Sequence, residues 1–495
     1  MKFSIAASLL VQAYVVLLGI LLMPVYLQHL GPEAFGLIGI FLMAQAWMQV
    51  LDMGFTPALS RDIARMRAGE LPRGESMVRL VTLEWLFGMA GFGVVALVWV
   101  NGELIAQNWL QGSELDSRTI ALSVSLMAAA IVVRWYAGLY RAVLTGLEQQ
   151  KRINALLAGF ATLRFAGVIP MLVYLSPTPE VFFSYQLLVS AFELLVSRFL
   201  GRYQIAAGEG VRPRLSSLRS MLPLVGSMGF LSLMWIAITQ IDKLILSGLL
   251  SLRDYGYFTL AVVAAGGVLM LIPSMTQVIQ PRLSYLVARG DHFLFKQLYC
   301  LASQGAAIGF VAIGASLAFF AEPIIQVWTG DAETARASAP ILFWYGLGNA
   351  IVGIMLVPFM MQFAKGDLRL HVVGQIVLLF TLVPALIVAA RNHGAIGAGQ
   401  VFFFANALFL LVWAPLVHKR FLPELGWHWL LRDTLPTVAL IVGALWLSAR
   451  HMPISMGPLR SLAWIGGASV LAAVAGAFAG SHTRRFLMLQ LRTLK

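Results

Sequence analysis

Charged residues and cysteine are both scarce in this chain. Only 12% of its 495 residues are Asp, Glu, Lys or Arg, about half the share found in a typical soluble domain. Hydrophobic residues make up 59%, which is more apolar surface than the interior of a soluble protein of this length can hold. The single cysteine, Cys300, excludes an internal disulfide. The composition therefore predicts a chain that is embedded in lipid.

Motifs of catalysis and metal binding are also missing. The sequence has no G-x-x-x-x-G-K-[ST] phosphate loop, no H-E-x-x-H helix, no S-x-x-K and no G-x-S-x-G elbow. Cys300 and the eight histidines do not follow the spacing of metal ligands. We therefore expect no enzyme, no metal ligand and no cofactor. An intramembrane glycan polymerase or ligase normally carries a large outer loop, and the longest outer stretches here, near 101–118 and 322–337, are too short to fold alone.

Long apolar runs dominate what is present. A membrane crossing needs roughly 20 mostly apolar residues, and fourteen runs meet that requirement. They lie near 5–28, 35–57, 78–100, 119–140, 153–175, 181–203, 222–248, 255–280, 299–321, 338–362, 370–390, 395–417, 433–449 and 461–480. The first run is too long for the apolar part of a signal peptide and no cleavage site follows it, so we interpret it as the first crossing. The predicted fold class is an all-α polytopic membrane protein with about fourteen transmembrane helices.

The positive charges predict the orientation. If the N-terminus is cytoplasmic, 26 of the 35 Lys and Arg residues lie in cytoplasmic segments and 6 in outer segments. The other three lie within the predicted crossings. Positive charge collects on the cytoplasmic side of membrane proteins, so both termini are expected to be cytoplasmic. Because the net charge of +13 is dispersed over these loops, it does not indicate a nucleic-acid partner.

Two segments about 220 residues apart are similar, residues 29–37 and residues 249–257. Each places an aromatic residue and a glycine at the start of the next helix. An offset of six helices preserves orientation, so it indicates a parallel repeat, and transporters of this design bind substrate between the two repeats. The predicted organisation is an N-terminal six-helix lobe at 1–203, a cytoplasmic linker at 204–220, a C-terminal six-helix lobe at 221–420, and two additional helices with a cytoplasmic tail at 421–495.

Charged and amide side chains inside the crossings are the candidate functional residues, since each charge costs about 2.5–3.5 kcal/mol to insert. Gln45, Gln49 and Asp52 share one helix face, and most of the other candidates also lie in the first six crossings. The candidate substrate-binding residues are Arg134, Arg164, Arg141, Lys243, Gln45 and Gln49. The candidate ion-coupling or cavity carboxylates are Asp52, Glu84, Glu193 and Asp242.

Two interpretations of these residues remain open. Arg134 and Arg164 could line a water-filled cavity, where their planar guanidinium groups suit phosphate oxygens. Alternatively, they could pair with buried carboxylates and hold the bundle together, and Arg141 could be a simple cytoplasmic anchor.

The turn at 30–36, the end of the second crossing at 51–55, and residues 240–246 with 255–257 carry a family resemblance. There the chain resembles the polysaccharide-transporter flippases of Wzx type, the O-antigen and exopolysaccharide exporters of the MOP superfamily. The resemblance implies two lobes that alternate access across the bacterial inner membrane. It implies an undecaprenyl-diphosphate-linked oligosaccharide as substrate, an ion gradient as driving force, and a cationic cavity to which Arg134, Arg164 and Lys243 would contribute. In the lipid II flippase branch, extra helices shape a groove for the lipid tail.

Two other functions are compatible with the sequence. A MATE-like antiporter of drug or metabolite cations would have the same fold, but it would favour carboxylates over Arg164 at its centre. A non-transporting membrane subunit of a polysaccharide synthase complex would bind the glycan polymerase or synthase machinery instead.

Overall fold

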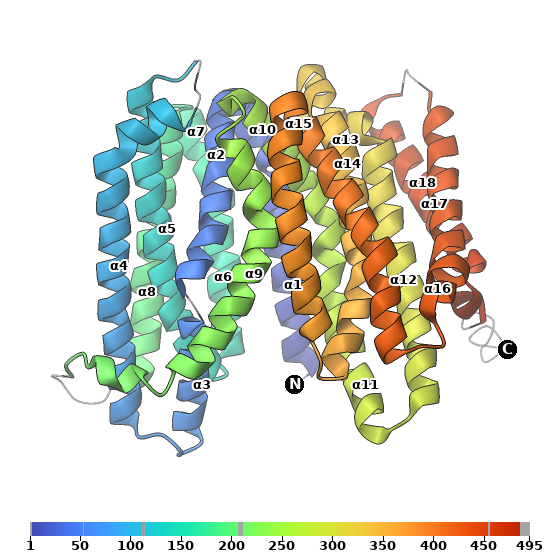
Figure 1. Cartoon of the computed structure of the whole chain (residues 1–495). Coiled ribbons are helices and arrows are strands. Elements are labelled where there is room, and N and C mark those ends of the chain that lie inside the picture. The colour runs from blue at the N-terminus through green and yellow to red at the C-terminus, as the bar shows by residue number, and fades with distance from the viewer. Residues whose placement is uncertain are drawn as a thin grey trace. The chain divides into compact units, whose positions relative to one another are not determined.

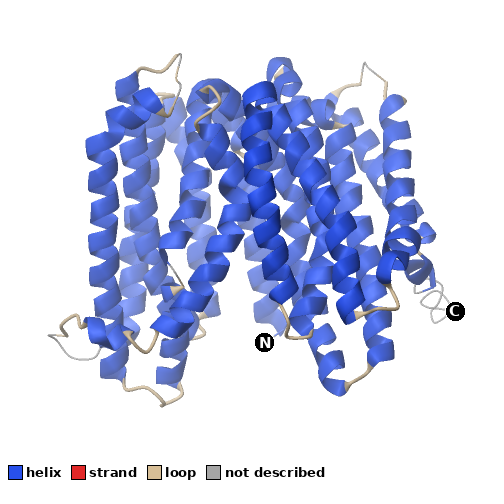
Figure 2. Ribbon diagram, in the orientation of Figure 1, coloured by secondary structure: helices blue, strands red, loops and turns tan. Residues whose placement is uncertain are grey.

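The computed structural model describes residues 2–52, 54–110, 112, 114–205, 211–453 and 456–485, and every regular element in these ranges is a helix (Figures 1 and 2). The chain divides into two compact units, residues 1–256 and 257–495. This division falls inside a helix. The predicted lobes at 1–203 and 221–420 concern the internal repeat and remain a prediction, and residues 206–210 of the predicted linker lie outside the described ranges.

The first unit is built around one central helix. Its elements are α1 (Lys2–Leu21), α2 (Met23–Asp52), α3 (Phe55–Arg67), α4 (Arg73–Asn108), α5 (Ser117–Gly146), α6 (Gln150–Phe165), α7 (Val168–Tyr174), α8 (Pro179–Ile205), η1 (Leu215–Leu218), α9 (Leu222–Ser247) and the start of α10 (Leu252–Gly266). Helix α5 packs against α8, α4, α3 and α2, while α1 packs on α6 and α9 on α2. Polar groups on α5 are therefore shielded from several sides.

The second unit is organised around α12 and α14. Its elements after α10 are η2 (Gly267–Met270), α11 (Leu271–Arg289), α12 (His292–Phe319), α13 (Ala321–Thr329), α14 (Ala332–Ala364), α15 (Arg369–Phe421), α16 (Gly426–His428), the π-helical turn η3 (Trp429–Thr434), α17 (Leu435–Arg450) and α18 (Pro458–Ala479). Helices α17 and α18, at the red end of the colour bar in Figure 1, pack on each other and on α12. Helix α13 and the start of α14 cover most of the predicted outer loop at 322–337, which is therefore largely helical.

Eleven segments of the described chain are long and apolar enough to cross a membrane. Two of them are too long for a single crossing. Leu10–Asp52 has 43 residues and Arg369–Phe421 has 53, which correspond to roughly 65 and 80 Å of helix against a hydrocarbon layer of about 30 Å. Each is broken by a glycine in a non-helical conformation, Gly31 with φ 79° and Gly394 with φ 56°. A residue with a Cβ rarely adopts these backbone angles, so glycine lets the chain reverse direction there.

The outer faces of these helices are apolar and uncovered. Phe92 and Val100 of α4, Phe380 of α15 and Leu471 of α18 are each more than 70% exposed within the chain. A soluble protein rarely leaves so many large apolar side chains in contact with water. Lipid is the solvent that suits these faces.

Within the first unit, the two similar segments meet. A Cβ at Gly36, near the first repeat's turn, would collide with the carbonyl oxygen of Leu252. A Cβ at Gly256 would collide in the same way with the carbonyl oxygen of Pro32. In both cases the glycine of one segment faces the residue four positions before the glycine of the other. Such a reciprocal contact is what a two-fold relation between the segments produces.

Candidate functional site

Three arginines and one glutamate from α5, α6 and α8 form a charged group inside the first unit, which we call the arginine cluster: Arg134, Arg141, Arg164 and Glu193. Arg134 and Arg141 are seven residues apart on α5, so they project from the same face. Both oxygens of Glu193 are used. Arg141 donates a hydrogen bond to Oε1 and Arg164 donates one to Oε2.

Arg134 completes the cluster without a carboxylate hydrogen bond of its own. Its guanidinium donates to the amide oxygen of Gln45 on α2, and it also interacts through space with the other three charged members. The cluster therefore combines three positive charges with one negative charge. Two formal positive charges are left over in the interior of the helix bundle.

Arg164 and Glu193 are buried, Arg134 and Arg141 are half-buried, and the hydrogen-bonding groups of the cluster are only partly satisfied. Arg164 is 5% exposed and Glu193 is 4% exposed. The amide of Gln186 on α8 donates to the backbone oxygen of Arg164 at 3.2 Å. The Nε atom of Arg164 has no hydrogen-bond partner among the described residues. An unmatched buried donor next to excess positive charge is an arrangement that an anion or ordered water stabilises.

Glu84 belongs to a second buried group that is electrically balanced. It accepts hydrogen bonds from the Tyr140 hydroxyl at 2.7 Å and from Arg202 Nε at 3.0 Å. Arg202 lies near the end of α8, so its ion pair with Glu84 links α8 to α4. The interpretation that buried charges hold the bundle together thus applies to Glu84, and in part to Glu193, which pairs with Arg141 and Arg164.

The other predicted site residues lie apart from the arginine cluster. Asp52, at the end of α2, accepts hydrogen bonds from the backbone and hydroxyl of Thr56 at the start of α3. Gln49, one turn after Gln45, is exposed. Asp242 is buried in α9 and forms an ion pair with its neighbour Lys243 at 3.2 Å.

Helical spacing on the sixth crossing indicates Gln186, because it lies seven residues before Glu193 on one helix face. The partnership of Gln45 with Arg134 has no such signal, since the two residues are 89 positions apart. A cavity at the cluster stays a prediction.

The arrangement of helices is similar to that of solved transporters of the MOP superfamily. The lipid II flippase MurJ, in an inward closed conformation, matches with a TM-score of 0.69 and 14% identity over 97% of this chain and 98% of that one. An inward-facing multidrug resistance MATE family transporter matches with a TM-score of 0.66 and 15% identity over 82% of this chain and 96% of that one. At such identities the likeness concerns the fold alone.

A third similar structure is described by the polarity of its binding pocket. It is a MOP superfamily transporter from Pyrococcus furiosus, whose binding pocket is said to have reverse polarity, and it matches with a TM-score of 0.56 and 15% identity over 84% of this chain and 96% of that one.

The family model of the polysaccharide biosynthesis proteins matches residues 3–287, more than half of the chain. The chain belongs to this family, which confirms the resemblance described above. A search of curated proteins gave no match. The family is that of the polysaccharide biosynthesis proteins, the fold is similar to that of solved membrane transporters, and eleven candidate spans make the described chain a multi-pass membrane protein.

Proposed function

We propose that this protein is a flippase that moves an undecaprenyl-diphosphate-linked oligosaccharide from the cytoplasmic to the periplasmic face of the bacterial inner membrane. Membership of the polysaccharide biosynthesis family and the likeness of its fold to that of MurJ support this proposal. The single observation that carries it is the excess of positive charge in the arginine cluster.

A buried positive charge costs about 2.5–3.5 kcal/mol on insertion scales, so two uncompensated charges cost roughly 5–7 kcal/mol. A negatively charged ligand would offset this cost whenever it is bound. Guanidinium groups bind phosphate oxygens through two parallel hydrogen bonds, which makes a diphosphate a suitable partner for Arg134 and Arg164. A carrier of organic cations would need the opposite balance of charge.

The proposed topology has fourteen crossings with both termini cytoplasmic. Eleven candidate spans become thirteen when Leu10–Asp52 and Arg369–Phe421 are each counted as two crossings. Helix α9, with 26 residues, supplies the fourteenth. Two six-helix lobes, 1–203 and 221–420, would alternate access, and α17 and α18 would be the additional pair.

Ion coupling is proposed for a carboxylate that can change its protonation or bind a cation without first leaving an arginine. Glu84 and Glu193 each accept hydrogen bonds from arginine, and Asp242 pairs with Lys243. Asp52 has no ion pair within the described part of the chain, and its carboxylate accepts hydrogen bonds from the hydroxyl and backbone of Thr56 and from the backbone of Gly54. We therefore assign the coupling role to Asp52 ahead of the other three.

The test is deletion of the gene followed by mass spectrometry of the lipid extract. Accumulation of undecaprenyl-diphosphate-linked oligosaccharide together with loss of surface polysaccharide is the expected result. Arg134→Ala and Arg164→Ala should reproduce the accumulation, and the exposed Arg118→Ala is the matched control.

Normal polysaccharide with no accumulated lipid would contradict the flippase proposal. Efflux of organic cations would then identify an antiporter. Loss of polysaccharide without lipid accumulation, combined with copurification of a glycosyltransferase, would instead identify a subunit of a synthase complex.

A further inference from the structure

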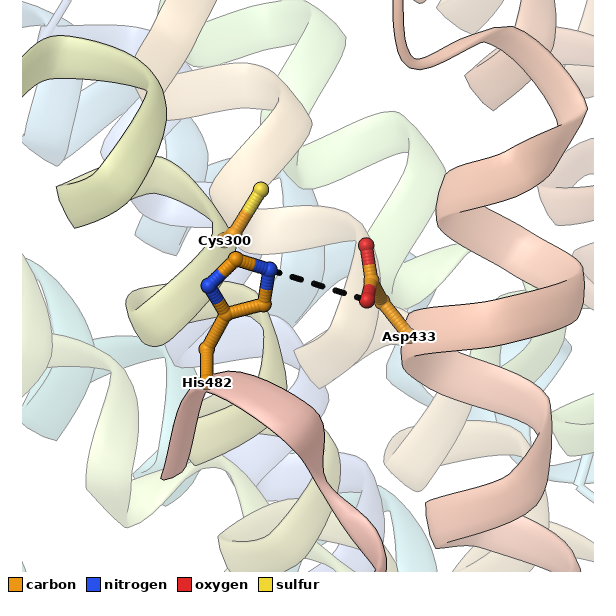
Figure 3. Close-up of side chains that lie close together, drawn as sticks. All are labelled: Cys300, Asp433 and His482. Atoms are coloured by element: carbon orange, nitrogen blue, oxygen red, sulfur yellow. Dashed lines mark ion pairs between the residues drawn. The ribbon is translucent and has the colours of Figure 1, made fainter. Parts of the chain in front are cut away.

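Three side chains of types that can ligate a metal ion come together in the second unit, from segments that are far apart in the sequence (Figure 3). Cys300 lies on α12, Asp433 on the π-helical turn η3, and His482 in the helical segment after α18. Their sulfur, oxygen and nitrogen ligand atoms all lie within 4.8 Å of one another. His482 Nε2 is 3.8 Å from the carboxylate of Asp433.

The positions of these side chains are set by a buried glutamine. Gln304, one turn after Cys300 on α12, is fully buried. Its amide oxygen accepts hydrogen bonds from the backbone N–H groups of His482 at 3.0 Å and Thr483 at 2.9 Å. Its amide nitrogen donates to Asp433 at 3.5 Å. Gln304 therefore holds both of the other segments beside Cys300, independently of any direct contact among the three ligand side chains.

The local backbone supports the same arrangement. Residues Trp429–Thr434 form a π-helical turn, and such turns are rare and frequent at functional sites. Close approach of the C-terminal segment also requires Gly480, because a Cβ there would lie 2.7 Å from the Gln304 amide oxygen. The π-helical turn lies just before α17 and Gly480 lies just after α18, and both segments approach the same part of α12.

The chemistry of the donor set selects the metal. Thiolate, imidazole and carboxylate are together the ligands of zinc, whereas magnesium and calcium take oxygen ligands. A thiolate and a carboxylate carry two negative charges, which neutralise Zn²⁺ in a partly buried place, and the imidazole binds as the neutral form. Ligand atoms around tetrahedral zinc are roughly 3.3–3.7 Å apart, given bond lengths of about 2.0–2.3 Å. Side-chain movements of about 1 Å would bring the most distant pair of ligand atoms to that separation.

We propose that Cys300, Asp433 and His482 form a zinc site with an open fourth position, which is taken by water. The metal links both ends of the α17–α18 pair to α12, since Asp433 lies two residues before the start of α17 and His482 three residues after the end of α18. The site is independent of the proposed transport function. It stabilises this helix pair in the cytoplasmic half of the proposed topology, where thiols stay reduced.

Cobalt replaces zinc in such sites and reports on sulfur ligation. Because Cys300 is the only cysteine of the chain, a thiolate-to-Co²⁺ charge-transfer band can come from this site alone. We expect the full-length protein in detergent to bind one Co²⁺ per chain with such a band in the near ultraviolet, and Zn²⁺ to displace it. Cys300→Ser should abolish the band. His482→Ala and Asp433→Asn should each weaken binding at least tenfold, since even outer partners of a metal contribute about that much.

His451→Ala is the matched control, because this exposed histidine at the end of α17 lies outside the group. The Co²⁺ titration is measured first on the unmodified chain, in which Cys300 is buried, so this test does not depend on the folding of any variant. The absence of a charge-transfer band in the unmodified protein would overturn the proposal. If both His482→Ala and Asp433→Asn keep the band and bind Co²⁺ with unchanged affinity, the proposal is also overturned.

Discussion

Replacing Glu193 with glutamine would leave three arginines facing a neutral side chain. Glu193 is the carboxylate that pairs with Arg141 and Arg164, and removing one partner of a buried ion pair typically costs about 3–5 kcal/mol. The Arg141 side chain is 26% exposed, so water can solvate part of the released charge. We therefore expect the lower end of this range for Glu193→Gln, about 3 kcal/mol, which is roughly a hundredfold change in the folding equilibrium.

Arg134→Gln should behave in the opposite way. It removes one of the two uncompensated positive charges and one hydrogen bond to Gln45, so its effect on stability should stay within about 1 kcal/mol. It should nevertheless reduce transport, because the diphosphate loses a guanidinium partner. The two variants therefore separate a stabilising role from a substrate-binding role within one cluster.

Membrane proteins often unfold irreversibly, so stability is measured as the half-life of monodisperse protein in detergent at a raised temperature. Transport is measured by accumulation of the lipid-linked oligosaccharide in cells that carry each variant at equal abundance. The reasoning fails if Arg134→Gln shortens the half-life as much as Glu193→Gln does. It also fails if Arg134→Gln leaves transport unchanged while Glu193→Gln leaves stability unchanged.

Three further predictions follow from other parts of the chain. Gly36→Ala should force apart the reciprocal helix contact in the first unit and reduce transport severalfold, whereas Gly93→Ala, where a Cβ meets nothing within 4 Å, should have no effect in the same complementation assay. Asp331→Ala should cost about 1 kcal/mol by removing the cap of α14, measured by thermal stability, and Asp331→Asn should retain it. Hydrogen bonds from Thr334 lower the pKa of the Asp331 carboxyl, so its contribution is complete above the usual Asp pKa and is lost as the pH falls through the lowered value. Asp52→Asn should leave substrate binding intact but abolish the dependence of flipping on an ion gradient in vesicles, and an unchanged gradient dependence would refute the coupling role.

The membrane-spanning character of the chain could be predicted from its sequence because lipid imposes a local rule. Every crossing needs about twenty apolar residues regardless of what it packs against, so each predicted run has a helix in the structure. The similarity of residues 29–37 to 249–257 was likewise visible as sequence, and Gly36 and Gly256 were part of it. The packing of each glycine against the backbone of the other segment was not visible, because no local pattern states which helix faces which.

The candidate sites depend on contacts between distant residues. Helical spacing placed Arg134 and Arg141 on one face of α5, yet only the packing of α6 and α8 against α5 brings Arg164 and Glu193 to them. Cys300 and His482 show no metal spacing because the ligand atoms come from segments 182 positions apart. The sequence by itself determined where the chain can enter lipid and which polar groups it carries there. The tertiary structure alone decided which charges are paired and which are left over, because that depends on the directions in which whole helices pack.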